Sequence, residues 1–233
     1  MSDVPTPGLS GMSKPTRQEV CRHIERAGIV PVVRAPSAAL AEKAADVLVR
    51  AGISVLEITL TVPDAVQVIE TLAARYAGTA VVGVGTVLSA DDVAAHVRAG
   101  AAFVVTPGFD AAVVQASHAL GVAAFAGALT PTEVISAMKA GADMIKIFPC
   151  SALGGAKYLR ALRGPLPGLK LLPTGGVTVH TVHEYIEAGA AALGVGSELV
   201  DAKLLSTDGD QGLDRLAARA REFLDALHKA RHL

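Results

Sequence analysis

A lysine lies in the middle of the apolar run MIKIFP, residues 144–149. If this run is a strand, side-chain alternation puts Met144, Lys146 and Phe148 on one face. A buried ammonium is costly unless it is paired or gives up its proton, and a neutral amine attacks carbonyl carbons. Lys146 is therefore a candidate nucleophile. The alternative is a structural lysine–carboxylate pair that fills the interior of the sheet.

A glutamate occupies a second apolar run, VLEITL, at residues 55–60. Alternation places Glu57 on the same face as Val55, Thr59 and Thr61. If Glu57 lies near Lys146, it can pair with the amine and move protons through water. The alternative is an ion pair without a catalytic role.

Arg34 ends a third apolar run, PVVRA, at residues 31–35. A guanidinium stays charged and holds a carboxylate through two parallel hydrogen bonds. Arg34 is therefore a candidate for binding a substrate carboxylate. The alternative is a salt bridge at the rim of the sheet, for example with Glu57.

Glycine-rich turns follow four of the apolar runs. The sequences GVGT (83–86) and TPG (106–108) offer close backbone approach to a ligand, and the first adds the hydroxyl of Thr86. The sequences PTGG (173–176) and GVGS (194–197) follow the last two runs. In barrels, this pair of turns commonly binds phosphate through backbone N–H groups. The alternative is that they are tight strand-to-helix turns.

These residues require a scaffold in which strands end at one common edge. Eight short apolar runs alternate with helical patterns: 29–35, 54–60, 80–86, 103–108, 122–128, 144–149, 170–176 and 192–198. The predicted helices are Ser37–Arg50, Pro63–Tyr76, Ala90–Arg98, Asp110–Ala119, Pro131–Lys139, Gly155–Leu162, Val179–Glu187 and Gly212–Ala230. An Ala-Gly pair recurs at glycines 52, 100, 141 and 189, a spacing of about two βα units.

The pattern predicts a single α/β domain, a (β/α)₈ TIM barrel over residues 17–233, with chemistry at the C-terminal strand ends. A helix over Arg17–Ala27 is expected to close the bottom. A doubly wound open sheet is the alternative, but no GxGxxG with a following acidic residue is present. Residues 1–16, rich in Pro, Gly and Ser, are expected to form a disordered N-terminal tail.

Composition and charge limit the classes of ligand and partner that we expect for this protein. The formal net charge is −1 and the basic residues are scattered, so we expect no nucleic acid partner. We also expect no signal peptide, no membrane span and a cytoplasmic location. Cys21 and Cys150 stand alone, as reduced thiols would. No histidine falls in an apolar run, and His180 with His183 indicates a solvated helix start; we expect neither a metal nor another cofactor.

With these residues in place, the chain resembles the 2-keto-3-deoxy-6-phosphogluconate (KDPG) aldolase family, which includes 4-hydroxy-2-oxoglutarate (KHG) aldolases. The resemblance runs from about residue 24 to about residue 200. Its phrases are VLEITLTVP, VGVGTVLSADD, VVTPGFD, GALTPTEVISAMKAGADMIKIFP and LLPTGGVT.

The resemblance implies a class I aldolase, a homotrimer and a small 2-keto acid substrate. It makes Lys146 the Schiff-base lysine and Glu57 the acid/base group. It places Thr86, Pro107 and Phe148 at the pyruvate pocket, and it assigns the phosphate side to Gly175, Gly176, Gly196 and Ser197. Thr174, in the turn PTGG, is a further candidate for binding the substrate.

One departure concerns the carboxylate. Many family members carry an arginine where this chain has Thr61, and in others the arginine comes from a first-strand phrase like VVRA, where Arg34 stands. Preference among KDPG, its galactonate epimer and KHG therefore stays open, as does the pathway, Entner–Doudoroff glycolysis or sugar-acid breakdown. The rival interpretations are another phosphate-binding barrel enzyme and a non-catalytic barrel that acts as a binding module.

Overall fold

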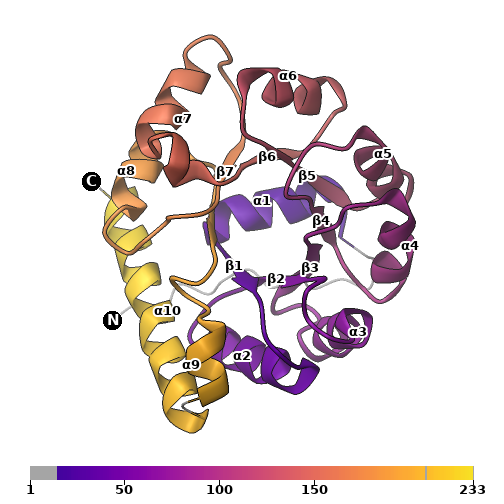
Figure 1. The fold of residues 1–233 in the computed structure, drawn as a ribbon, viewed down its shortest axis with the longest axis vertical. Coiled ribbons are helices and arrows are strands. Elements are labelled where there is room, and N and C mark those ends of the chain that lie inside the picture. The colour runs from indigo at the N-terminus through magenta and orange to yellow at the C-terminus, as the bar shows by residue number, and fades with distance from the viewer. Residues whose placement is uncertain (1–14, 208, 233) are drawn as a thin grey trace.

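The computed structural model describes residues 15–207 and 209–232 and contains a (β/α)₈ barrel (Figure 1). Parallel strands and helices alternate along the chain, as the sequence predicts. The strands are β1 (Ile29–Val33), β2 (Val55–Thr59), β3 (Val81–Gly85), β4 (Phe103–Val105), β5 (Ala123–Ala128), β6 (Met144–Ile147), β7 (Leu171–Pro173) and β8 (Leu193–Val195). The predicted single-domain barrel is confirmed, and the open doubly wound sheet is excluded by the closure described next.

The strands form one ring. Their order is β7-β6-β5-β4-β3-β2-β1-β8, with parallel pairing throughout. The ring closes between β7 and β8 through a single bridge, Thr174–Gly194, and Ala191 N donates to Leu171 O at 2.8 Å. All strands therefore end at one edge, as candidate site residues from different strands require.

Helices surround the ring. They are α1 (Arg17–Ala27), α2 (Ala38–Arg50), α3 (Ala65–Arg75), α4 (Ala90–Arg98), α5 (Ala111–Ala119), α6 (Pro131–Lys139), α7 (Ala156–Arg163), α8 (Val182–Glu187), α9 (Ala202–Thr207) and α10 (Gly209–Arg231), with a 3₁₀ turn η1 (Cys150–Leu153). The sequence missed η1 and α9, which have four and six residues, too few for a periodic pattern. The structure begins α8 three residues later than predicted, because Thr178 N donates to Thr181 Oγ1 in a preceding turn.

Local capping explains where the helices begin. Ser37 and Ser89 accept hydrogen bonds from backbone N–H groups in the first turns of α2 and α4. Thr130 and Glu133 form a capping box at α6, and Thr16 with Glu19 forms another at α1. Thr16 thus caps a helix although the sequence placed it in the tail; the rest of that predicted tail, up to residue 14, lies outside the described residues.

Side-chain alternation divides the core into two layers. The outer layer packs strands against helices and includes Leu56, Ile58 and Ile147. The inner layer fills the lower barrel with Val30, Val55, Val81, Phe103, Val105, Ala123, Phe125, Met144 and Leu172. Helix α1 covers this floor through Val20, Cys21 and Ile24, and Figure 1 shows it behind the strands, across the end of the barrel. Chemistry is thereby confined to the opposite end.

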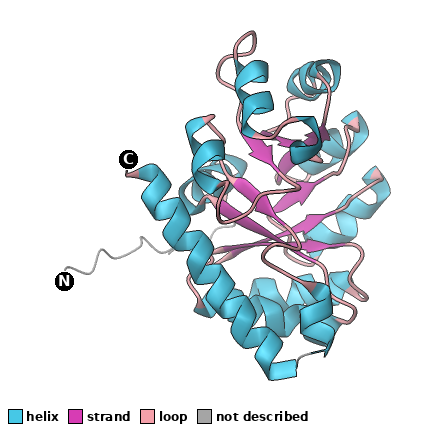
Figure 2. Ribbon diagram, turned by 60° about the vertical axis from the view of Figure 1, so that its left-hand side comes forward, coloured by secondary structure: helices cyan, strands magenta, loops and turns pink. Residues whose placement is uncertain are grey.

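The long helix α10 runs along the outside of the barrel (Figure 2). Near its end, the Arg231 guanidinium donates to the carbonyls of Glu25 and Arg26 and so secures the last turn of α1. Cys21 and Cys150 are both buried and free, and burial raises their thiol pKa values to about 12 and about 11. Among the described helices, none is long and apolar enough to cross a membrane.

Candidate active site

The two polar residues of the barrel interior meet across its axis. Glu57 lies on β2 in register with Val32 and Gly83, and Lys146 lies on β6 in register with Gly127 and Leu172. In the ring, β2 and β6 stand opposite each other. Lys146 Nζ is 3.5 Å from Glu57 Oε1, with side-chain exposures of 3% and 0%. The spatial pairing predicted from sequence is present.

Glycines on the inner face make this meeting possible. A Cβ at Gly85 would lie 2.0 Å from Glu57 Oε1, so any side chain there would displace the carboxylate. A Cβ at Gly127, which is aligned with Lys146, would lie 2.3 Å from the carbonyl carbon of Pro107. These two absent side chains let Glu57 extend inward and let the loop after β4 fold over the site.

The carboxylate of Glu57 is buried without a hydrogen bond. Neither Oε1 nor Oε2 has a hydrogen-bond partner among the described residues. Within that part of the chain, Lys146 is the one cation that forms an ion pair with this carboxylate. A buried carboxylate without hydrogen bonds is costly in free energy. Such an arrangement is typical of functional sites, where unpaired polar atoms form hydrogen bonds with the substrate.

The surroundings of the amine are mostly apolar. Lys146 Nζ lies 5.5 Å from the centre of the Phe148 ring, a cation–π distance. Ile147, between Lys146 and Phe148, packs in the outer layer, because neighbouring strand residues face opposite sides. The peptide bond between Phe148 and Pro149 is cis, a feature that the sequence did not indicate.

Pro107 and Thr86 each lie next to one of the two glycines beside the Lys146–Glu57 pair: Pro107 contacts Gly127, and Thr86 follows Gly85. The loop of Pro107 is held by Thr106, whose Oγ1 accepts from Gly127 N at 2.9 Å and donates to Gly108 O at 2.6 Å. Thr86 directly follows Gly85 and has φ +63°, a left-handed conformation that is rare for a β-branched residue. Backbone strain of this kind concentrates at functional sites.

Arg34 continues the inner face of β1 above Val30 and Val32. Its Nη1 donates to Thr61 Oγ1 at 3.5 Å; Thr61 shares a 2.7 Å hydrogen bond with Thr59, and Thr59 donates to Val33 O at 3.0 Å. A pocket of about 440 Å³ opens beside Arg34 and Thr61. The guanidinium is exposed and does not pair with Glu57, so the suggested rim salt bridge is absent from the described residues.

The loop after β7 is held from both sides. Cys150 N donates to Thr174 O and Ser151 N donates to Gly175 O, which ties the loop to η1. Gly175 and Gly176 have φ of +87° and +77°, and a Cβ at Gly176 would lie 2.3 Å from Ser151. Thr174 is buried, and a Cβ at Gly194 would lie 2.1 Å from its Oγ1. Glycine is therefore required at 176 and 194 by the fold itself.

Gly196 differs from these glycines. A Cβ there would meet nothing within 4 Å, and its φ lies outside the left-handed region. Its carbonyl accepts from Leu199 N and Val200 N, so the chain turns sharply after β8. The packing of this protein does not require a glycine here, in contrast to Gly176.

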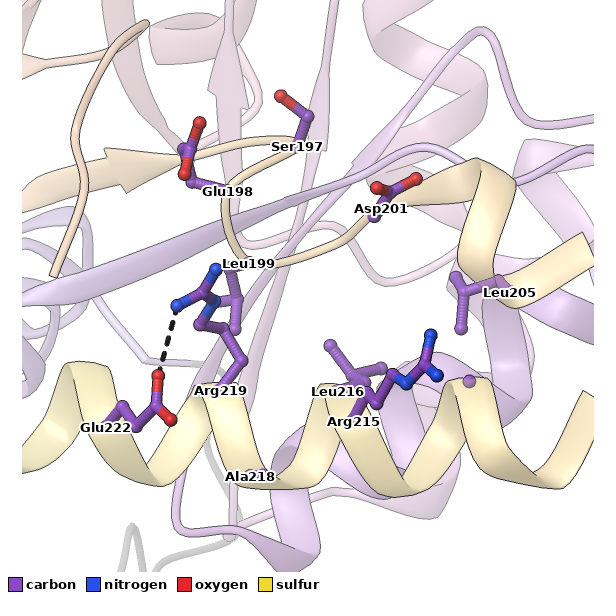
Figure 3. A pocket seen from close by; sticks show the side chains of 11 residues that line it. Ser197, Glu198, Leu199, Asp201, Leu205, Arg215, Leu216, Ala218, Arg219 and Glu222 are labelled. Carbon is purple, nitrogen blue, oxygen red and sulfur yellow. Dashed lines mark hydrogen bonds and ion pairs between the residues drawn. The ribbon is translucent and has the colours of Figure 1, made fainter. Parts of the chain in front are cut away.

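Ser197 lies beside a second pocket. This pocket, of about 470 Å³, lies between the turn after β8 and α10, and Figure 3 shows Ser197 and Glu198 above Arg219. Its lining mixes Glu198, Asp201 and Glu222 with Arg215 and Arg219, and Arg219 pairs with Glu222 at 3.1 Å. The lining excludes Lys146 and Glu57 and carries both charge signs, so the pocket is not an anion site in itself.

No group of three or more possible metal ligands occurs among the described residues. His183 Nε2 lies 3.2 Å from Glu187 on α8, an exposed pair. The site therefore consists of an amine, a carboxylate, a guanidinium and backbone turns at the open end of a barrel. Together they define a class of protein: a (β/α)₈ barrel whose interior holds a desolvated lysine–glutamate pair suited to carbonyl chemistry.

Comparison with known proteins agrees with this class. The family model described as KDPG and KHG aldolase matches residues 20–216. The 2-dehydro-3-deoxy-6-phosphogalactonate aldolase of Escherichia coli is 35% identical over 196 residues, covering 84% of this chain and 91% of that protein. The 2-dehydro-3-deoxy-phosphogluconate aldolase of Haemophilus influenzae is 32% identical over 212 residues, covering 91% and 98%.

A solved structure is similar as well. The KDPG aldolase of Legionella pneumophila, with pyruvate captured as a covalent carbinolamine intermediate, superposes with a TM-score of 0.76 at 28% identity, covering 84% of this chain and 96% of that one. The chain belongs to the KDPG and KHG aldolase family and is therefore an aldolase of the aldehyde-lyase class.

Proposed function

We propose that the protein is a class I, Schiff-base aldolase that cleaves KDPG to pyruvate and glyceraldehyde 3-phosphate, with Lys146 as the nucleophile. One observation carries the proposal: a buried amine faces a buried carboxylate at 3.5 Å, and neither carboxylate oxygen is hydrogen-bonded within the described residues. A purely structural ion pair would gain by having its remaining oxygen atoms satisfied.

The reaction begins when the ammonium of Lys146 passes a proton to the Glu57 carboxylate, and the neutral amine then attacks the C2 ketone and forms a carbinolamine. Glu57 gives a proton to the departing hydroxyl, which leaves as water, and an iminium remains. Glu57 then takes the proton of the C4 hydroxyl, through water, as the C3–C4 bond breaks. The bonding electrons pass to the iminium nitrogen, the aldehyde leaves, and an enamine of pyruvate stays on Lys146.

The second half returns the enzyme to its starting state. Glu57 returns its proton to C3 of the enamine, which restores the iminium. Water adds to this iminium, the carbon–nitrogen bond breaks, and pyruvate leaves with Lys146 free. The water released during iminium formation balances the water consumed here.

Binding groups surround the pair on the open end of the barrel. Arg34 and Thr86 hold the substrate carboxylate, and Pro107 with Phe148 forms the apolar wall against the three-carbon pyruvate unit. The turns that contain Thr174, Gly175, Gly176, Gly196 and Ser197 receive the phosphate through backbone N–H groups. Fixing both ends of the substrate presents its ketone to the amine.

A second candidate substrate is the galactonate epimer of KDPG, because the Escherichia coli relative that acts on it is 35% identical. KHG, which would give pyruvate and glyoxylate, is a third substrate of the same chemistry. Initial rates with the three compounds decide among them. The highest kcat/KM identifies the substrate. The glycine turns suit a phosphate, which favours KDPG and its epimer over KHG, and a higher value for the epimer than for KDPG would overturn the choice of KDPG.

The nucleophile itself is tested by borohydride reduction in the presence of pyruvate, followed by intact mass measurement and peptide mapping. One reduced pyruvate adduct on Lys146 is the expected result, because reduction traps the iminium. A folded protein that gives no adduct would refute Schiff-base chemistry, and an adduct on another lysine would move the nucleophile. Omission of pyruvate is the control.

Gly196 offers a test of the phosphate side. Gly196→Ala is expected to leave the melting temperature unchanged, because its Cβ meets nothing, and to raise KM for KDPG about tenfold as the methyl group obstructs the phosphate. Pyruvate trapping is expected to stay normal. The matched variant Gly176→Ala is expected to lose about 1–2 kcal/mol of stability, because Gly176 has positive φ. An unchanged KM in Gly196→Ala would remove this turn from phosphate binding.

We also propose a homotrimer, in line with the family resemblance. Sedimentation equilibrium should then give three times the 23.7 kDa chain mass.

A further inference from the structure

Ser151 lies against the turn PTGG (173–176) that follows the neighbouring strand β7. It belongs to η1, which comes directly after β6, the strand of Lys146. A Cβ at Gly176 would lie 2.3 Å from both Cβ and Oγ of Ser151. The serine side chain therefore occupies the space beside the Cα of Gly176 in which any other residue would place its own side chain.

Backbone hydrogen bonds hold Ser151 in this place. Its N–H donates to Gly175 O at 3.1 Å, and its carbonyl accepts from Gly154 N at 3.1 Å. One residue earlier, Cys150 N donates to Thr174 O at 2.8 Å. These contacts use only backbone atoms, so the connection between η1 and the turn does not depend on the serine hydroxyl. Ser151 is exposed, which makes its hydroxyl accessible to a ligand at the open end of the barrel.

The same turn begins beside the apolar wall of the site. A Cβ at Gly175 would lie 3.4 Å from Cδ2 of Phe148, and the centre of the Phe148 ring lies 5.5 Å from Lys146 Nζ. The phosphate of KDPG stands at the opposite end of the carbon chain from the ketone. A substrate whose ketone is at Lys146 and whose chain passes Phe148 and Gly175 therefore brings its phosphate to Gly176, where Ser151 lies.

We propose that Ser151 is a further ligand of the substrate phosphate, with its hydroxyl donating to a phosphoryl oxygen bound by the backbone of the turn 173–176. This inference rests on the proposed function. A hydroxyl forms a short, charge-assisted hydrogen bond with an anionic oxygen. Ser151 would thus raise the preference for a phosphorylated keto acid over its dephosphorylated form. The sequence did not indicate this residue, because its contact with Gly176 joins the ends of two different strands.

The test compares KDPG with 2-keto-3-deoxygluconate, which has the same carbon chain without the phosphate. In Ser151→Ala, KM for KDPG is expected to rise about tenfold at unchanged kcat, as for the loss of one hydrogen bond to a charged group. The kcat/KM for 2-keto-3-deoxygluconate and the pyruvate concentration for half-maximal trapping on Lys146 should stay at wild-type values. Ser136→Ala, which removes a serine of α6, is the matched control and should change neither substrate.

Ser151→Asp is the stronger variant, because its carboxylate would repel the phosphate. KM for KDPG is expected to rise about 100-fold, whereas cleavage of 2-keto-3-deoxygluconate should stay at the wild-type level. An unchanged KM for KDPG in both variants would overturn the inference. Equal losses for the two substrates would overturn it as well, since they indicate a distorted turn.

Two results with the wild type would contradict the proposed function itself. Equal kcat/KM for KDPG and 2-keto-3-deoxygluconate would refute phosphate recognition, and the role of Ser151 with it. Absence of any pyruvate adduct on Lys146 would refute the Schiff-base mechanism.

Discussion

Replacing Lys146 by alanine is expected to lower kcat for aldol cleavage by about 10⁴–10⁶-fold and to eliminate the pyruvate adduct, because Lys146 is the amine that faces Glu57 inside the barrel. Steady-state cleavage assays with KDPG and borohydride trapping measure the two effects. Near-wild-type turnover in the variant would disprove the Schiff-base mechanism. Lys139→Ala, which changes an exposed lysine, is the control and should behave like wild type.

Substitution of Lys146 is also expected to change the stability of the fold. Removing the amine leaves the Glu57 carboxylate buried beside no cation, which is expected to cost about 3–5 kcal/mol in the free energy of unfolding. Lys146→Met preserves most of the volume and isolates this charge effect. The double variant Lys146→Met/Glu57→Gln should regain much of the lost stability in urea unfolding while remaining inactive, because the buried charge is gone but so is the nucleophile.

Glu57→Gln is expected to separate binding from turnover. The amide keeps the shape of the side chain but cannot accept and return protons, so kcat should fall by about 10²–10⁴-fold. The pyruvate iminium should still form and be trapped on Lys146, although more slowly. Single-turnover mixing followed by borohydride reduction distinguishes the steps.

Two results would contradict this role for Glu57. Normal turnover in Glu57→Gln would exclude the carboxylate from proton transfer. Complete loss of trapping at long incubation would mean that Glu57 organises Lys146 rather than moving protons. Gly85→Ala is a useful companion, because its Cβ would lie 2.0 Å from Glu57 Oε1 and displace the carboxylate without changing its chemistry.

The fold was predictable because its rules are local. Short apolar runs, serine and threonine caps, and a glycine after each of several helices recur along the chain, and each is visible in sequence. Eight strand–helix units of this kind form a closed parallel barrel in which all strands end on the same side. Elements of four to six residues, such as η1 and α9, do not span enough turns to show a period.

The site was predictable in part. The alternation rule put Glu57 and Lys146 on inner faces, and the buried charges required each other. The clearance at Gly85 and Gly127 was not predictable, because it depends on side chains that reach across the barrel from distant strands.

The single bridge between β7 and β8 has a consequence for how ligand binding and folding are coupled. Local opening of a barrel starts where the hydrogen-bonded ladder is thinnest, here at Thr174–Gly194. The two proposed phosphate turns begin on opposite sides of that seam. A phosphorylated ligand that contacts both turns would bridge β7 and β8. Its binding would therefore raise the free energy of opening the barrel between these two strands.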